Sequence, residues 1–225
     1  MQAVITGDLI SSSKYPKGFL EKISSELKKE FKELENHYGG NFSFWRGDSF
    51  QGSIGQAEDA LGLTLRLKAL VNKIEATPSS RKVKSQAPTA DVRIAVALGE
   101  VMSIAAEPAE SNEEIFIRSG KTLDSMQSAK RTIVLRSGNA SVDRELDVEL
   151  TLLEFLTDRW SVASAEVVYF KLKGFSDQEI AAKLDVSLPA VYKRKKIAGW
   201  NACELVIKRY EELVNQLPGY GVRYE

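Results

Sequence analysis

The sequence has little sulfur and almost no histidine. Cys203 is the only cysteine and His37 the only histidine among 225 residues. One cysteine excludes an intramolecular disulfide, and these two residues cannot build a Cys/His zinc site. This cysteine usage fits a reducing compartment. We interpret Cys203 as a small core residue and His37 as a helix C-terminal residue favoured by the dipole.

The chain also lacks a net charge and a long apolar run. Lys plus Arg equal Asp plus Glu at 31 each, so any attraction to nucleic acid or to an anionic membrane must come from a local patch. No window approaches 18 apolar residues, and "MQAVITGDLI" has no basic leader followed by a long apolar segment. We therefore expect a cytoplasmic protein with no membrane partner.

What is present is ordinary globular sequence, with 43% hydrophobic and 28% charged residues. Residues 2–7 predict a strand, and a helical stripe that runs from Phe19 to Leu34 ends at Gly39-Gly40. Residues 41–46 and 49–54 predict a hairpin around Gly47-Asp48. Residues 56–75 alternate like a strand in part, but their length favours a helix.

The next part of the chain predicts an exposed loop, a strand, a helix and a closing strand. These cover residues 77–91, residues 92–106 with a turn near Gly99, residues 113–131 and residues 132–137. Ile117, Gly120, Leu123 and Met126 are predicted to share one helical face. The order indicates an α+β fold in which helices cover one sheet over residues 1–138, followed by an all-α domain over 139–225.

Two Gly-Asp pairs, Gly7-Asp8 and Gly47-Asp48, end predicted strands. If these strands are neighbours, the two carboxylates converge and repel each other unless a cation neutralises them. Magnesium takes one or two carboxylates together with substrate phosphates, so the pair implies a nucleoside triphosphate site. Ser11 and Ser12 would offer hydroxyls and backbone N–H groups to the phosphates. The alternative is that each Asp only stabilises a turn.

The stretches "ITGDLISSS", "FWRGDSFQG", "VRIAVALGEV" and "FIRSGKTLDS" resemble the N-terminal part of the SatD family and, more distantly, class III nucleotidyl cyclase catalytic domains. The resemblance implies a ferredoxin-like, nucleotidyl-cyclase-like sheet. It also implies a purine nucleotide ligand, and Mg²⁺ or Mn²⁺ bound by Asp8 and Asp48. Arg93, Ile94 and Gly99 are similar to the cyclase strand motif.

The sequence departs from the cyclase pattern at three positions. Arg118 stands where the cyclases have asparagine, Thr122 where they have the transition-state arginine, and Phe42 where many have a purine-selecting lysine. Losing a cation aimed at developing charge costs about 10² to 10³ in rate, unless Arg118 or Arg46 compensates. Nucleotide binding survives such losses, so we rank sensing above catalysis. The alternative is an active cyclase or another triphosphate-dependent enzyme with an appended docking module.

The C-terminal part predicts a helix-turn-helix over about residues 163–200. A first helix stops at Gly174, and Ser176 with Glu179 forms a capping box for the second. Ser187 is placed to cap a third helix that begins Leu188-Pro189.

The order of residues from Glu179 to Val191 resembles the helix-turn-helix of sigma-factor region 4 and of LuxR-type regulators, with Asp185 in place of the usual turn glycine. In such modules the third helix enters the major groove of double-stranded DNA. The resemblance then assigns DNA contacts to Leu188, Ala190, Tyr192, Lys193, Arg194, Lys195 and Lys196. The alternatives are a solvated helical face or a protein-interaction domain.

Together these patterns predict a DNA-binding regulator that responds to a nucleotide or a metal ion. A homodimer is expected, because cyclase-like domains usually pair. After Trp200, the apolar positions from Leu205 to Leu217 continue a helix that would pack on the module or pair with a second chain. A scaffold whose helix-turn-helix binds protein is the third possibility.

Overall fold

A computed structural model of the chain describes residues 1–45, 47–76, 89–100 and 114–217. Its centre is a five-stranded mixed sheet with the strand order β2-β3-β1-β4-β5. The strands are β1 (Gln2–Leu9), β2 (Gly40–Trp45), β3 (Ser49–Ile54), β4 (Val92–Gly99) and β5 (Ile133–Arg136). The central strand β1 is antiparallel to both β3 and β4, and β5 runs parallel to β4.

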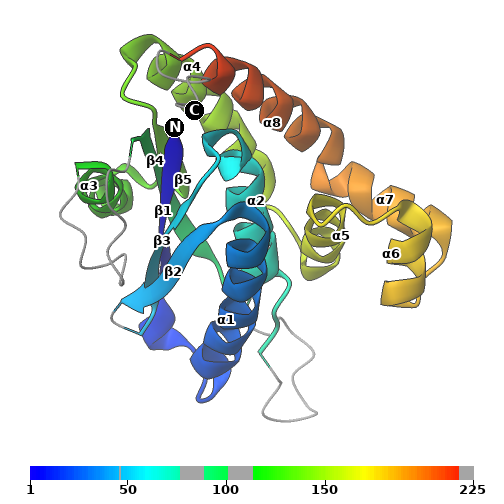
Figure 1. The fold of residues 1–225 in the computed structure, drawn as a ribbon. Helices are drawn as coiled ribbons and strands as arrows, with labels where there is room; N and C mark the ends of the chain where they lie inside the picture. Colours follow the sequence, from blue (N-terminus) through cyan, green and yellow to red (C-terminus); the bar gives the residue numbers. More distant parts are fainter. Residues whose placement is uncertain (46, 77–88, 101–113, 218–225) are drawn as a thin grey trace.

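Helices cover the sheet on both faces and continue to the C-terminal end of the described chain (Figure 1). They are α1 (Phe19–Tyr38), α2 (Ala60–Asn72), α3 (Glu114–Ala129), α4 (Ala140–Thr157), α5 (Val162–Leu172), α6 (Asp177–Leu184), α7 (Leu188–Ala198) and α8 (Trp200–Asn215). The predicted α+β fold, in which helices cover one sheet, is confirmed. The finer nucleotidyl-cyclase-like fold stays a prediction, as does the domain boundary near residue 138.

The side chains of β1 alternate between two different layers. Ala3, Ile5 and Leu9 join the main hydrophobic cluster with α1 and α2, whereas Val4 packs with α3 residues and Thr6 bonds to one. This period of two follows from the pleat of a strand. Asp8 therefore lies on the α3 face of the sheet, with Thr6.

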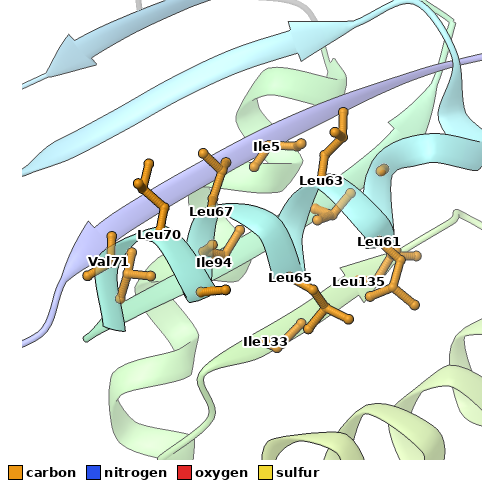
Figure 2. Packing of buried hydrophobic residues seen from close by; sticks show 14 of the residues in the cluster. Ile5, Leu61, Leu63, Leu65, Leu67, Leu70, Val71, Ile94, Ile133 and Leu135 are labelled. Atoms are coloured by element: carbon orange, nitrogen blue, oxygen red, sulfur yellow. The ribbon is translucent and has the colours of Figure 1, made fainter. Parts of the chain in front are cut away.

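Helix α2 is buried along nearly its whole circumference, which explains the ambiguous pattern of its sequence. Figure 2 shows its leucines against one face of the sheet: Leu67 lies near Ile5, and Leu65 lies near Ile133. The opposite side of α2 packs against α5. The helix predicted over residues 56–75 is therefore present as α2, which is shorter and follows the 3₁₀ helix Ala57–Asp59.

Helix α3 is rotated from the predicted face. Its buried residues are Ile115, Phe116, Ser119, Thr122 and Met126, whereas Ile117 is 43% exposed. Of the four residues predicted to share one face, Met126 is buried and Leu123 packs partly buried against its cluster, whereas Ile117 is exposed. Hydrogen bonds within the sheet interface set the rotation, because the Ser119 hydroxyl lies 2.7 Å from Thr6 Oγ1 and turns a small polar residue inward.

Helix α8 packs back on the first part of the chain. It contacts α2, α4 and the 3₁₀ helix Ala57–Asp59, and the Tyr210 hydroxyl donates a 2.6 Å hydrogen bond to the Ala57 carbonyl. The main hydrophobic cluster is therefore continuous from the sheet to α8. Cys203 is fully buried in this cluster, and burial raises the pKa of its thiol to about 12, which makes it a poor nucleophile.

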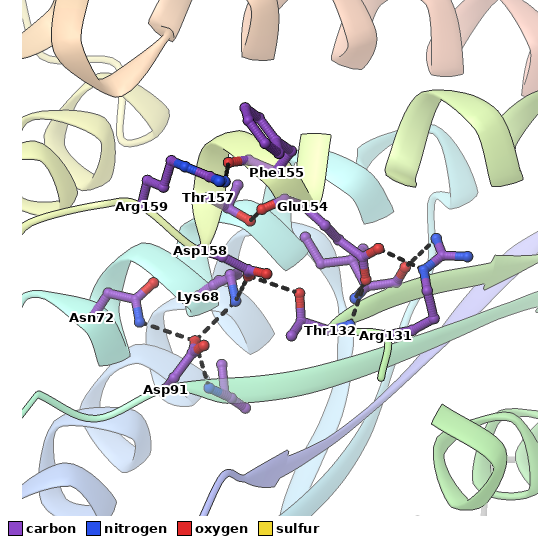
Figure 3. A network of polar contacts seen from close by, with 12 residues as sticks. Lys68, Asn72, Asp91, Arg131, Thr132, Glu154, Phe155, Thr157, Asp158 and Arg159 are labelled. Carbon is purple, nitrogen blue, oxygen red and sulfur yellow. Dashed lines mark hydrogen bonds and ion pairs between the residues drawn. The ribbon is translucent and has the colours of Figure 1, made fainter. Parts of the chain in front are cut away.

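Buried charges tie α2 and α4 to the sheet (Figure 3). The fully buried Lys68 on α2 lies 2.8 Å from an Asp91 carboxylate oxygen and 3.5 Å from one of Asp158. Glu154 on α4 accepts hydrogen bonds from the backbone N–H groups of Thr132 and Ile133 at the start of β5. These contacts satisfy groups that burial would otherwise penalise.

Candidate functional site

Asp8 and Asp48 both lie beside Ser49. Asp8 lies directly opposite Ser49 of β3, and Asp48 precedes Ser49 at the end of the hairpin turn. The Ser49 hydroxyl lies 3.1 Å from Asp8 Oδ1 and 3.5 Å from Asp48 Oδ1. One hydroxyl is therefore within reach of both carboxylates.

The glycines of the two Gly-Asp pairs have different roles. A Cβ on Gly7 would lie 2.2 Å from the Phe50 ring, so the ring excludes any side chain there. Gly47 has a φ of 80°, in the left-handed region that glycine adopts without strain. Close packing thus explains Gly7, and a tight turn explains Gly47.

Arg93 supplies a positive charge beside Asp8. It lies opposite Asp8 on β4, and its Nη2 donates a 2.6 Å hydrogen bond to Asp8 Oδ2. The sequence argument assigned this neutralising role to a cation. Because the protein itself places a guanidinium there, Asp8 is compensated without a bound metal ion.

The predicted phosphate-binding serines differ in their contacts. Ser12 donates a 2.5 Å hydrogen bond to Asp48 Oδ2, so it holds the second carboxylate in place. Ser11 is exposed in a left-handed conformation with a φ of 57°. Tyr15 secures this segment through a hydrogen bond to the Ile10 carbonyl, and burial raises the pKa of its phenol, which keeps it neutral.

A cleft of about 530 Å³ opens beside Asp8, between the sheet and α3. Its floor is polar: Gln51 Nε2 donates to Thr6 Oγ1 at 2.8 Å and to Ser119 Oγ at 3.1 Å. The lining includes Arg93 and Lys121 as cations, Asp124 as an acid and Trp45 as an aromatic surface. The cleft thus combines groups that bind anions with a ring on which a planar base can stack.

Arg118 lies away from the two aspartates. Its Nη2 donates a 2.7 Å hydrogen bond to the carbonyl of Leu98, which pairs with Ala3 at the opposite end of β1 from Asp8. There it lines a second cleft, of about 460 Å³, with Lys121 and Arg136. Thr122, which stands at the cyclase arginine position, donates to the Arg118 carbonyl. Arg46 lies outside the described residues.

The C-terminal caps have the geometry that the sequence predicts. Ser176 and Glu179 form a reciprocal capping box at the start of α6, and the Ser187 side chain accepts a hydrogen bond from the Ala190 N–H at the start of α7. Asp185 ends α6 in the left-handed conformation, with φ 51° and ψ 50°. Ile180 and Val191 pack on Val167 of α5, so a small separate core fixes α7 on α6.

The basic residues of α7 divide into two pairs. Arg194 bonds Glu166 at 3.0 Å and Lys195 bonds Asp177 at 2.9 Å, whereas Lys193 and Lys196 are exposed. Burial would raise the pKa of the Asp177 carboxyl, but Lys195 and Lys171 hold it below its usual value. Tyr192 is 50% exposed, and Leu188 and Ala190 are half-buried. The outward cationic surface of α7 is therefore Lys193 and Lys196.

Sequence reasoning missed Trp45, Gln51 and Lys121 as parts of the cleft. The alternation of Ser49, Gln51 and Ser53 with apolar residues on β3 is a signal that this sheet face is polar. The position of α3 above that face has no comparable signal, because it depends on packing between distant segments.

The chain matches no protein-family model and no curated protein. Among the residues that the structure describes, no group of three or more His, Cys, Asp or Glu side chains could hold a metal ion. Asp8 and Asp48 each contribute a carboxylate near the Ser49 hydroxyl, and carboxylate oxygens are ligands that magnesium prefers. No helix in the described ranges is long and apolar enough to cross a membrane.

Proposed function

We propose that the protein is a DNA-binding regulator whose α6–α7 unit acts as a helix-turn-helix and whose α7 contacts the major groove. The observation that carries this proposal is the outward surface of α7, on which Tyr192, Lys193 and Lys196 are exposed on a helix with a fixed N-terminal cap. Exposed lysines can bind phosphates without first breaking an ion pair. Arg194 and Lys195 act first as internal ties to α5 and α6, and Leu188 and Ala190 lie at the end that approaches base edges.

The cleft beside Asp8 is the proposed sensor site. Its ligand would be a purine nucleotide, with the base on Trp45 and the phosphates near Arg93 and Lys121, which line the cleft. Ser12, which bonds Asp48, would offer a further hydroxyl to the phosphates. Asp8 and Asp48 would hold Mg²⁺ or Mn²⁺, which would neutralise phosphate charge when bound. Sensing is favoured over cyclase catalysis because Arg118 points to a carbonyl at the other end of β1 and Thr122 carries no charge.

Polar contacts between α1 and α5 would link ligand binding in the cleft to the proposed DNA reader, the α6–α7 unit. Tyr169 on α5 bonds Glu30 on α1, and Lys173, the residue after α5, bonds Glu33 of α1, at 2.6 Å in both cases. Helix α5 in turn packs against α6 and α7. A ligand that shifts α1 or α2 would move the base of the reader through these contacts. This coupling is part of the proposal.

Fluorescence anisotropy with mixed-sequence duplex DNA tests the reader. The Lys193→Gln/Lys196→Gln variant is expected to lose most binding at low salt. A matched variant, Lys29→Gln/Lys32→Gln on the exposed side of α1, is expected to bind like the wild type. Equal losses in both variants, or no binding by the wild type, would overturn the proposal.

Isothermal titration with ATP and GTP, each with Mg²⁺ or Mn²⁺, tests the sensor. Binding that Asp48→Ala and Arg93→Gln weaken supports the cleft as the site. Cyclic product that disappears in Asp48→Ala would instead establish the cyclase alternative. No binding of either nucleotide would remove the sensor and leave the α7 proposal standing.

A further inference from the structure

Helix α4 carries an exposed apolar stripe. Val148, Leu152 and Phe155 are 63%, 67% and 60% exposed, although large apolar residues in the described chain are mostly buried. They follow one another at steps of four and three residues, so they lie on one face of the helix. A contiguous apolar patch of this kind is typical of an interaction surface.

Charged residues of opposite sign flank the stripe, one on α4 and the other, Arg159, in the turn after α4 ends at Thr157. Glu145 lies three residues before Val148, and Arg159 lies four residues after Phe155. The alternating steps of three and four are the spacing of a heptad seam between two helices. The seam therefore has an acidic end, an apolar middle and a basic end.

This seam is complementary to itself when two copies run antiparallel. Glu145 and Arg159 each lie seven residues from Leu152, so Leu152 is the midpoint. A two-fold axis there would place Leu152 on Leu152, Val148 near Phe155, and Glu145 near Arg159 of the other copy. A parallel pairing would bring like charges together at each end.

The charged side chains at the two ends of the seam differ in their partners. At the acidic end, Glu145 bonds Arg209 of α8 at 2.7 Å, and Glu149 has a buried Oε2 without a described partner. Burial and the nearby Glu145 raise the pKa of the Glu149 carboxyl. At the basic end, the Arg159 guanidinium stacks on Phe155 at 3.5 Å and makes no ion pair with a described residue. Glu149 and Arg159 thus have opposite charges, and neither forms an ion pair with a described residue.

We infer that a second copy of this chain packs antiparallel on the α4 seam, with the Arg159 of each copy beside the Glu145 and Glu149 of the other. Leu205 on α8, 69% exposed and four residues from Arg209, extends the apolar surface. The contact would then consist of two α4 and two α8 helices. The inference gives the expected homodimer a specific contact surface. Only its consequence for DNA binding rests on the proposed function.

The proposed dimer would also fix how the two α7 helices are placed relative to each other. The Trp160 side chain, just after α4, donates a 2.9 Å hydrogen bond to the Ala198 carbonyl at the end of α7. Fixing α4 against its copy would therefore fix the two α7 helices about the same two-fold axis. The preferred duplex would be a palindrome.

Sedimentation equilibrium of the full chain tests the surface. The wild type is expected to dimerise, and Leu152→Glu is expected to be monomeric because it places two carboxylates on the axis. Ile117→Glu, a matched change at an exposed apolar residue of α3, should leave the dimer intact. A monomeric wild type, or a dimer that Leu152→Glu leaves unchanged, would overturn the inference.

Exchanging the charges at positions 149 and 159 distinguishes a loss of dimerisation from a loss of folding. Arg159→Glu and Glu149→Arg should each weaken the homodimer by roughly tenfold, since two ion pairs per dimer become repulsive. Mixing the two variants should restore dimers, because in the mixed dimer both contacts between position 159 and position 149 again join opposite charges. Failure of the mixture to associate would contradict the antiparallel register. DNA binding through Lys193 and Lys196 is measured separately, so it can succeed while this surface fails.

Discussion

At the scale of single residues, a polar cluster around the buried Arg66–Glu30 pair joins α1 and α2 to α5. Arg66 on α2, 5% exposed, bonds Glu30, which is 3% exposed, and Nη2 of the same guanidinium lies 2.7 Å from Glu33. Tyr169 of α5 bonds Glu30, and Lys173, the residue after α5, bonds Glu33. A paired buried charge adds little net stability, but removing one partner leaves the other uncompensated.

Arg66→Met is expected to lower the free energy of unfolding by about 3 to 5 kcal/mol, because it leaves Glu30 charged and buried. The double variant Arg66→Met/Glu30→Gln removes the stranded charge and keeps an acceptor for Tyr169, so it should recover much of the loss. Urea unfolding measures both variants. A double variant no more stable than the single one would show that packing, not charge, sets the cost.

The acid dependence of stability provides a second test of this cluster. Burial would raise the pKa of the Glu33 carboxyl, but the hydrogen bond from Lys173 and the charge of Arg66 hold it below its ordinary value of 4.5. A depressed folded-state pKa contributes stability above the unfolded pKa and loses it as the pH falls through the folded value. Glu33→Gln should therefore be less stable than wild type at pH 7, with the gap closing below about pH 4.5. A gap of constant size across pH 7 to 3 would contradict this assignment.

At the scale of elements, the turn between α6 and α7 determines how α7, the helix that we propose contacts DNA, is placed on α6. The turn contains Asp185 in the left-handed region, where most residues other than glycine are strained by about 1 to 2 kcal/mol. Asp reduces that cost because its short side chain can bond locally. The caps at Ser176 and Ser187 then define the ends of both helices.

Asp185→Gly is expected to stabilise the protein by about 0.5 to 1 kcal/mol, since the relief of strain exceeds the extra entropy of glycine in the unfolded chain. Asp185→Ala keeps the strain and loses the polar side chain, so it should be destabilised. Thermal denaturation of the three proteins compares them. A gain in Asp185→Ala equal to that in Asp185→Gly would point to the removed charge instead of the backbone.

Elements differ in how far the sequence predicts them. Helix α1 and the two capped helices α6 and α7 have local signals, namely a helical stripe and N-cap residues, and these determine their ends. The rotation of α3 and the burial of Arg66 and Lys68 depend on contacts with segments far along the chain. Local patterns cannot report such contacts.

The candidate site could likewise be predicted only in part from the sequence. The two strand ends predict that Asp8 and Asp48 converge, and Ser49 lies within 3.5 Å of both. The ion pair of Asp8 with Arg93 follows from the pairing of β1 with β4, which no local pattern specifies. Arg118 was expected near the nucleotide, but its helix places it at the other end of β1.

At the scale of the whole molecule, one hydrophobic cluster spans the predicted domain boundary. Ile5 and Leu65 from the first part share it with Leu150, Trp200 and Tyr210 from the second. Removing the helices after residue 138 would expose the outer side of α2. Movements of the sheet layer and of α8 are therefore expected to be coupled.

Unfolding in urea should accordingly be a single transition, in which circular dichroism and tryptophan fluorescence coincide. Trp45 reports on the sheet, whereas Trp160 and Trp200 report on the helices that follow it. Two separated transitions would show that residues 1–138 and 139–225 fold independently.

The most direct test of the account is the salt dependence of duplex binding. Each phosphate contact contributes a slope of about −0.9 to log K against log salt. The account predicts that Lys193→Gln and Lys196→Gln each reduce the magnitude of the slope by about 0.9 per reader. A wild-type slope near zero, or one that both variants leave unchanged, would contradict the claim that α7 binds DNA.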